Sequence, residues 1–209
     1  MNDSTTALEY PANKLAIGHA RMLDAIRHRW SPRAYSDRAV TSDDLTALFD
    51  AASWSASCFG EEPWRFIVAS KDKIEEYQKM LGCLVEFNQS WAKNAPVLFL
   101  TVTSKNFAHN NKPNGYAMHD VGMALATLMI QASSMGMHAH AMGGFDRDKA
   151  RSTYNIPEDY DLGAAVAVGY VGDHTLLPEG MQKTELAPRK RKPLSETLFS
   201  GTWANPAAL

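Results

Sequence analysis

Residues 116–137 limit how this chain can fold more than any other stretch, because they have helical spacing but no polar face. Apolar side chains surround the whole circumference of the expected helix: Met118, Val121, Met123, Leu125, Leu128, Met129, Ile130, Ala132 and Met135. A helix that is apolar on all sides must be buried on all sides. A second subunit could supply one of the covering faces, with Met and Ala side chains allowing close packing. The alternative is a helix at the centre of a monomeric core.

Further helices and short β-rich segments make up the rest of the chain. Helical periodicity and capping residues predict four more helices, over 14–29, 41–52, 71–84 and 146–154. Thr41 and Asp146 are the expected caps of two of these helices. Strands are expected over 64–69, 96–103 and 164–171. The second of these strands is a near-continuous apolar run, which is typical of a strand covered on both faces.

The chain shows no internal repeat and no composition break, so residues 1–209 are predicted to form one domain. Residues 1–13 are polar and predict a loose N-terminal arm. Residues 194–209 contain apolar side chains but no helix long enough to bury them. Such a segment usually lies over the body of the protein or over a partner.

Charge and cysteine content exclude several classes of partner. The 21 Lys and Arg residues against 23 Asp and Glu give a net charge of -2, so no global field favours nucleic acid or an anionic membrane. The two cysteines do not suggest a disulfide framework, and no span of about twenty apolar residues exists. We therefore expect a cytoplasmic protein with no nucleic-acid partner and no membrane partner.

Familiar catalytic and metal-binding motifs are absent from the sequence. It contains no Walker loop, no G-x-G-x-x-G after a strand and no G-x-S-x-G elbow. His138 and His140 could share one face of a strand, but no acid or cysteine lies at ligand spacing, so we interpret them as ordinary histidines. The sequence gives little support for a hydrolase, a kinase or a metalloenzyme, and no metal ligand is predicted.

Two basic clusters at opposite ends of the chain are the remaining candidates for a binding site. Pro32 disfavours helical geometry at Ser31, so the first helix should end near Arg29. In the extended chain beyond, Ser31 and Arg33 point to one side. The second cluster is Arg189-Lys190-Arg191-Lys192. Guanidinium groups suit a phosphate or carboxylate, so the clusters would form one anion site if the fold joins them. Taken alone, the first cluster also fits a solvated basic helix end.

Six segments, in order along the chain, resemble signatures of the nitroreductase family of flavoproteins. They are Ile26, Arg29, Ser31, Arg33 and Tyr35; Ala56 to Trp64; Phe87-Asn88; the long helix with Asp120 and its ending Gln131 to Met137; Gly144-Phe145-Asp146 with Ala167 to Tyr170; and Arg189-x-Arg191-x-Pro193-Leu194. The second of these segments begins a run whose last part, Pro63 to Val68, is a close match to the family. No single motif is specific, but six in the family's order argue against chance agreement.

The resemblance implies a fold and an assembly. The expected fold is α+β, a nitroreductase-like three-layer arrangement with a central mixed or antiparallel sheet flanked by helices. The family pattern also implies an intertwined homodimer, in which residues 194–209 reach over the partner subunit.

The resemblance also implies FMN as cofactor and gives candidate roles to residues of this chain. The phosphate would be held by Arg29, Ser31, Arg189 and Arg191, with Trp30 contributing its backbone. Arg33 would lie near the N1/O2 edge of the flavin, where a cation favours the reduced ring, and Asn88 would bond the pyrimidine side. The faces of the ring would be lined by Ala56, Ser57 and Cys58 of the partner subunit and by Met142, Gly143 and Gly144.

The implied activity is that of an FMN-dependent NAD(P)H oxidoreductase. Hydride would pass from NADH or NADPH through flavin N5 to a nitroaromatic, a quinone or a related acceptor in a ping-pong cycle, with no catalytic side chain. Two alternatives stay open: a relative with different flavin chemistry, such as dehalogenation or enone reduction, and a flavin-binding protein without turnover. The sequence does not choose between NADH and NADPH.

Four positions depart from the family pattern. Gly60 and Glu62 replace a common Asn and Gln, Trp91 stands where some members carry a lysine, and Gly143 where some carry a glutamate. Loss of the lysine would make the flavin harder to reduce. The acceptor cannot be read from the sequence because the poorly matched segment 104–119 should supply the lining residues, with Phe107, Tyr116 and His119 as candidates.

Overall fold

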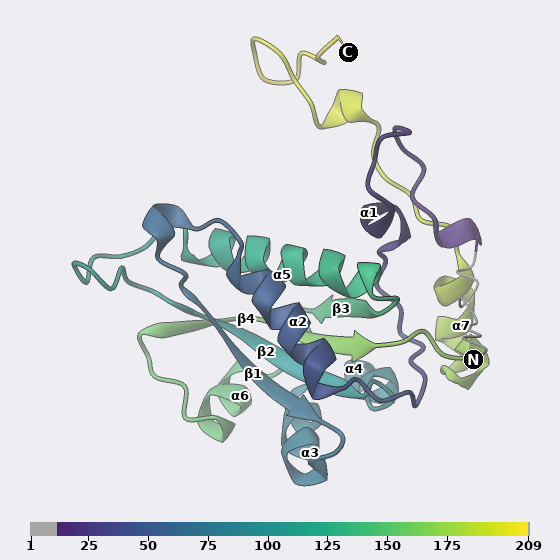
Figure 1. The fold of residues 1–209 in the computed structure, drawn as a ribbon, viewed down its shortest axis with the longest axis vertical. Helices are drawn as coiled ribbons and strands as arrows, with labels where there is room; N and C mark the ends of the chain where they lie inside the picture. The colour runs from purple at the N-terminus through teal and green to yellow at the C-terminus, as the bar shows by residue number, and fades with distance from the viewer. Residues whose placement is uncertain (1–11, 209) are drawn as a thin grey trace, which may run out of the picture.

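The computed structural model describes residues 12–208 and has an antiparallel four-stranded sheet at its centre (Figure 1). The strand order is β1 (Trp64–Ser70), β2 (Val97–Ser104), β4 (Tyr160–Gly169) and β3 (His138–Met142). Every neighbouring pair in the sheet is antiparallel. The expected α+β class is confirmed, and the sheet is antiparallel rather than mixed.

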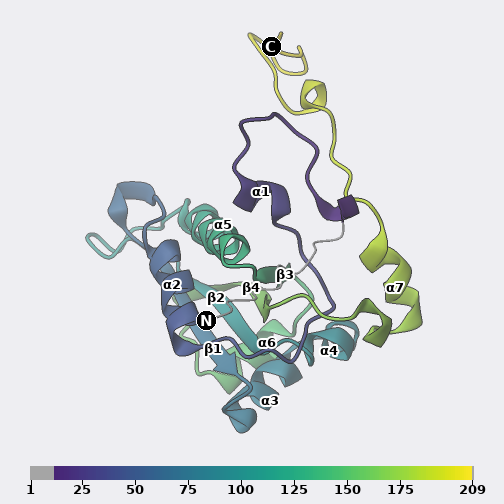
Figure 2. The ribbon, with the colours of Figure 1, turned by 45° about the vertical axis from the view of Figure 1, so that its right-hand side comes forward.

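Helices cover both faces of the sheet and give the predicted three layers (Figures 1 and 2). One face packs against α2 (Ser42–Ser53) and α5 (Ala117–Ser134). The other packs against α3 (Ile74–Cys83), α4 (Glu86–Ala92) and α6 (Arg147–Thr153). Each face therefore has its own hydrophobic core, with the sheet between them.

The strand β2 contributes to both cores, as its apolar sequence predicts. Successive side chains of a strand point to opposite faces, and here Phe99 faces the α2/α5 core while Leu100 faces the α3/α4/α6 core. Both side chains are buried. A strand covered on both faces cannot tolerate polar alternation, which explains the near-continuous apolar run.

Two helix starts follow the predicted capping chemistry. The Thr41 hydroxyl accepts from the Asp44 backbone N–H at 3.1 Å, and the Asp44 carboxylate accepts from the Thr41 N–H at 2.9 Å, which completes a capping box for α2. Asp146 caps α6 by accepting from the Lys149 N–H at 2.9 Å. Both N-termini are thus specified by local sequence.

The expected first helix over 14–29 is wrong. The structure has a short 3-10 helix η1 (Ala12–Lys14), an irregular segment, and then only α1 (Asp24–His28). The Arg27 guanidinium donates to the Ala16 and His19 carbonyls, both at 3.1 Å, and so fixes a chain reversal in place of helical turns. The helix ends near Arg29, as Pro32 predicts.

Two helices were not predicted. α4 precedes β2, and α7 (Glu179–Leu186) follows the sheet within a stretch that shows no clear periodicity. Only Met181 and Glu185 of α7 are buried, so its apolar stripe is too narrow to be recognised from sequence. Short 3-10 turns complete the elements: η2 (Cys58–Gly60), η3 (His174–Leu176) and η4 (Leu194–Glu196).

The long helix α5 is only partly covered within one chain. Its sheet-facing side is buried, including Leu128, whereas Met118, Gly122 and Ala126 are exposed along the outward side. The expectation that an all-apolar helix is buried on every side is therefore not met by a single chain.

The structure describes little of the expected N-terminal arm but nearly all of the C-terminal arm. Of the expected N-terminal arm, residues 1–11 lie outside the described residues, and 12–13 belong to η1. The segment from η4 to residue 208 extends away from the three-layer body (Figure 1). Its Leu194 and Trp203 side chains are largely exposed. Within residues 12–208, no helix is both long and apolar enough to cross a membrane.

Candidate functional site

The two basic clusters meet in one cavity, as the anion-site hypothesis requires. The cavity has a volume of about 320 Å³ and lies where the chain after α1, the helix α7 and the segment that follows α7 come together. Its charged lining side chains are the cations Lys14, Arg29, Arg33, Arg189 and Arg191 and the single carboxylate of Glu185. Ser31 and Trp30 also line it.

Arg189 joins the two ends of the chain at this cavity. Its guanidinium donates to the backbone carbonyl of Arg29 and, at 2.8 Å, to that of Arg27. These are the carbonyls at the C-terminal end of α1, where a cation also complements the helix dipole. Arg189 therefore fixes the geometry of the cavity, while Arg29 and Arg191 present charge to it.

Burial and neighbouring cations lower the pKa values of Arg29 and Arg189. Burial, followed by the charge of Arg191, lowers the pKa of Arg29. Burial and the charges of Arg29 and Arg191 lower the pKa of Arg189. The Arg29 guanidinium also lies 3.4 Å from the Ser31 hydroxyl, so a hydroxyl and a cation face the same space. An anion placed there would relieve the mutual repulsion.

Three residues that line the cavity also carry buried donors without partners. Among the residues that the structure describes, the buried Nε atoms of Arg33 and Arg189 and the Nε1 of Trp30 have no hydrogen-bond acceptor. Buried donors without acceptors are costly, and in native proteins they point to an unseen acceptor. Guanidinium, indole and hydroxyl donors together suit a phosphate, which has several oxygen acceptors.

The strand β3 supports this cavity from behind. The His140 Nδ1 donates to the Pro32 carbonyl at 2.8 Å, and the His140 ring lies 4.7 Å from the Trp91 ring. The His138 ring meets the Trp30 ring edge-on at 5.9 Å. The two histidines share one strand face, and both contact the 29–33 segment. Trp91, which departs from the family pattern, is a fully buried core residue.

Two neighbouring cavities extend the basic one into a groove. A cavity of about 240 Å³ shares Arg29, Arg189 and Arg191 with it and has apolar walls from 16–26. A cavity of about 430 Å³ on the other side shares Arg33 and Thr184 and continues to Phe87 on α4. The groove is thus cationic in the middle and largely apolar toward α4, which suits a flat ligand with an anionic tail.

Asn88 follows the lining residue Phe87 on α4 and contacts Gly144. The Asn88 side-chain Nδ2 donates to the Gly144 carbonyl at 2.8 Å. A Cβ at Gly144 would stand 2.7 Å from that Nδ2, so only glycine permits the contact. A Cβ at the neighbouring Gly143 would meet no atom within 4 Å. Met142, the last residue of β3, is buried.

The structure does not bring Ala56, Ser57 and Cys58 to the groove of their own chain. The Cys58 N–H donates to the buried Asp120 carboxylate at 2.9 Å, at the N-terminal end of α5. The basic cavity adjoins β3, which follows the opposite end of that helix, and the helix rises about 21 Å from Asp120 to Ser134. These three residues therefore line neither the basic cavity nor its two neighbours in the same chain.

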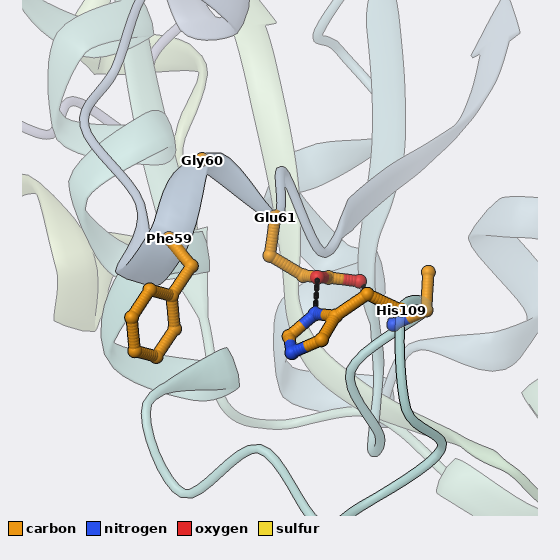
Figure 3. Close-up of a pocket in the computed structure, with 5 residues that line it drawn as sticks. Phe59, Gly60, Glu61 and His109 are labelled. Carbon is orange, nitrogen blue, oxygen red and sulfur yellow. Dashed lines mark hydrogen bonds and ion pairs between the residues drawn. The ribbon is translucent and has the colours of Figure 1, made fainter.

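A further cavity of about 710 Å³ lies beside this loop (Figure 3). Glu61 joins the loop to the hairpin around His109, with 3.5 Å between its carboxylate and the His109 Nδ1. The rings of Phe59 and Phe107 lie 5.9 Å apart. Phe59 adopts φ +56° and is exposed, and Gly60 follows with φ +67°, which accounts for a glycine there. None of the three candidate acceptor residues lines this cavity, although the Phe107 ring packs against two that do, Phe59 and His109.

Comparison with known proteins identifies the family. A model described as the nitroreductase family matches residues 26–170, which is more than half of the chain. This chain belongs to the nitroreductase family. A Mycolicibacterium smegmatis protein named "Uncharacterized 15.4 kDa protein in ask 5'region" is 32% identical over 148 residues, which are 68% of this chain and 99% of that protein.

The names of two further similar proteins mention an electron donor or a cofactor. A Methanothermobacter thermautotrophicus protein, provisionally named an NADH dehydrogenase/NAD(P)H nitroreductase, is 28% identical over 160 residues, covering 73% of this chain and 78% of that protein. The crystal structure of an oxidoreductase containing FMN superposes with a TM-score of 0.85 at 33% identity, covering 90% of this chain and 96% of that chain.

Sequence reasoning missed Glu185, Lys14 and the supporting role of the two histidines. Glu185 could not be found because α7 was not recognised, and Lys14 because its segment was expected to be helical. Across residues 12–208, no group of three His, Cys, Asp or Glu side chains is placed to hold a metal ion.

We expect His138 to make the protein less stable in mild acid. Burial, followed by the charge of Arg29, lowers its pKa from 6.5 to about 4. Because the unfolded chain binds a proton at higher pH than the folded one, the free energy of unfolding should fall as pH decreases from 6.5 to 4. The His138 contribution is about 3 kcal/mol across that window.

Denaturant unfolding of wild type and His138→Gln at several pH values measures this effect. The variant should lose much of the acid-side slope, whereas His174→Gln, which alters a half-buried histidine, should keep it. Identical slopes in wild type and His138→Gln would contradict the assignment.

Proposed function

We propose that the chain is an FMN-dependent NAD(P)H oxidoreductase that acts on small-molecule acceptors such as nitroaromatics and quinones. The observation that carries the proposal is the single cavity made from the two basic clusters, continued by an apolar groove toward Asn88. The FMN-containing relative of the same fold supports it. A soluble donor such as NADH or NADPH also suits a cytoplasmic enzyme.

The phosphate end of FMN fits the basic cavity. Arg29, Ser31 and Arg191 would donate to the phosphate, and Arg189 would hold the α1 end in place while offering its Nε. Charge-assisted bonds from several donors to a dianion are strong and geometrically selective. Trp30 would add its indole N–H, in addition to the expected backbone contact.

The ring end fits the groove toward α4. Arg33 would stand at the edge of the ring that gains negative charge on reduction. The Asn88 amide uses its nitrogen on Gly144, which leaves its oxygen to accept from the pyrimidine side of the ring. When bound, FMN supplies the redox chemistry, accepting hydride from NAD(P)H and passing electrons to the acceptor. The protein residues bind and orient it, and no catalytic acid or base is assigned.

A second copy of the chain would complete the site. The exposed outward side of α5 is apolar, and Ala56, Ser57 and Cys58 do not line the groove of their own chain. Both observations support a homodimer in which that loop faces the partner's flavin and residues 194–208 reach over the partner. The cavity at Phe59 and His109 would then lie beside the ring of the partner's flavin, where an acceptor binds.

Anaerobic visible spectroscopy tests the proposal directly. The purified protein should carry a flavin absorption band that bleaches on addition of NADH or NADPH and returns on addition of an acceptor. A flavin that stays oxidised with both donors would favour a binding protein without turnover. Absence of flavin, even after FMN is added, would contradict the proposal.

Arg191→Ala should weaken FMN binding by about tenfold to a hundredfold, because it removes a charged donor to the phosphate. Fluorescence titration of the flavin-free protein gives the dissociation constant. Lys192→Ala is the matched control, since Lys192 belongs to the same basic run but does not line the cavity. Unchanged affinity in Arg191→Ala would show that the phosphate lies elsewhere.

Ala126→Glu should separate the dimer, because it places a charge on the exposed apolar side of α5. Sedimentation equilibrium should then give the mass of one chain, 23.1 kDa, instead of twice that mass. Gln78→Glu on the exposed side of α3 adds the same charge and should leave the mass unchanged. A wild-type protein of 23.1 kDa would contradict the proposed assembly.

A further inference from the structure

One carboxylate is buried among the cations of the basic cavity. Glu185, on α7, is only 3% exposed, and it shares the cavity with five Lys and Arg side chains. Within that lining it is the sole acidic residue. A fixed negative charge at a site for an anionic ligand weakens the attraction for that ligand, so its presence calls for a physical explanation.

The contacts of Glu185 are directed at the Arg33 side of the cavity. Its Oε1 accepts from the Arg33 N–H at 2.7 Å and from the Ala34 N–H at 3.1 Å. Its Oε2 lies 4.0 Å from the Arg33 Nη1. One carboxylate thus holds both the backbone at Arg33 and the guanidinium of the same residue, across about 150 positions of sequence.

Lys14 adds a second cation to the Glu185 side. Its ammonium donates to the Ala187 carbonyl at 2.6 Å, two residues after Glu185, and lies 4.8 Å from the Trp30 ring. Burial lowers the pKa of Lys14 and the charge of Glu185 opposes that shift. The negative charge of Glu185 therefore acts on Arg33 and Lys14, whereas the pKa shifts of Arg29 and Arg189 come from burial and from other arginines.

The backbone contacts alone do not require a carboxylate. A glutamine amide oxygen could accept from the same two N–H groups, because its shape and reach match those of glutamate. The charge is what distinguishes Glu185 from such a residue. Its proximity to Arg33, rather than to Arg29 or Arg191, divides the cavity into a partly neutralised half and a fully cationic half.

We propose that Glu185 is a positioning and charge-setting residue of the flavin site, the internal counter-ion of Arg33. It fixes the 33–34 backbone, leaves the phosphate to the Arg29 and Arg191 half, and reduces the positive charge at the ring edge. The inference rests on the proposed function. The wild-type protein should therefore bind FMN less tightly than a variant with an uncharged residue at position 185. The reduction potential of its bound FMN should also be lower than in that variant.

Two substitutions separate the charge of Glu185 from its hydrogen bonds. Glu185→Gln keeps an acceptor for the two backbone N–H groups but frees the charge of Arg33. It should bind FMN about three- to tenfold more tightly than wild type, as expected for one added unit of charge near a dianion. It should also shift the midpoint potential of the bound flavin to a more positive value.

Glu185→Ala removes the charge and the acceptor together. It should bind FMN more weakly than Glu185→Gln, because the 33–34 backbone is no longer held. If Glu185 had only a structural role, both variants would bind FMN more weakly than wild type. The midpoint potential of the bound flavin would then not become more positive in Glu185→Gln. Glu179→Gln, in the exposed first turn of the same helix, is the matched control and should change neither quantity.

Titration with FMN gives the dissociation constant for each flavin-free protein: wild type, Glu185→Gln, Glu185→Ala and Glu179→Gln. The midpoint potential of each complex is then measured against a reference dye. Tighter binding and a more positive potential in Glu185→Gln alone support the inference. If wild type binds FMN and Glu185→Gln binds it no more tightly than wild type, the inference is overturned but the proposed function is not. A wild type that binds no FMN overturns both.

Discussion

The hydrogen bonds from the Arg189 guanidinium to the Arg27 and Arg29 carbonyls hold the candidate site together. They join the end of α1 to a segment about 160 residues later. Without them the two basic clusters would be ordinary charged surface, each solvated separately. With them, Arg29 and Arg191 face one space, and their mutual repulsion makes that space selective for an anion.

The three-layer body supplies a rigid support for this junction. β3 is an edge strand of the sheet, and its two histidines contact Trp30 and Pro32, so the segment that carries Ser31 and Arg33 rests on the sheet rather than on solvent. A site supported by packed strands keeps its geometry better than one built from loops alone. Glu185 then fixes the last part of the segment from the other side.

Local sequence signals predicted the parts of the fold that depend on local chemistry. The Thr41 cap, the Asp146 cap and the doubly covered β2 were all predicted correctly, because each follows from neighbouring residues or from the strand period. The expected helix at 14–29 failed because the Arg27 side chain binds the carbonyls of a chain reversal. α7 was missed because it buries only two side chains.

The site shows the same division between local and long-range information. Clustered arginines and the Pro32 constraint identified the basic segments, and the family resemblance ordered them around a flavin. The partner of Arg33 could not be predicted, because Glu185 lies on an unrecognised helix about 150 residues away. Ala56, Ser57 and Cys58 stay a prediction, since their expected contact lies across a subunit boundary.

The most direct measurement of the central claim compares FMN with riboflavin, which lacks the phosphate. Titration of the flavin-free protein with each ligand isolates what the joined basic clusters contribute. FMN should bind at least about a hundredfold more tightly than riboflavin, because several charge-assisted bonds are lost with the phosphate. Equal affinity for the two ligands would contradict the assignment of the basic cavity as the phosphate site.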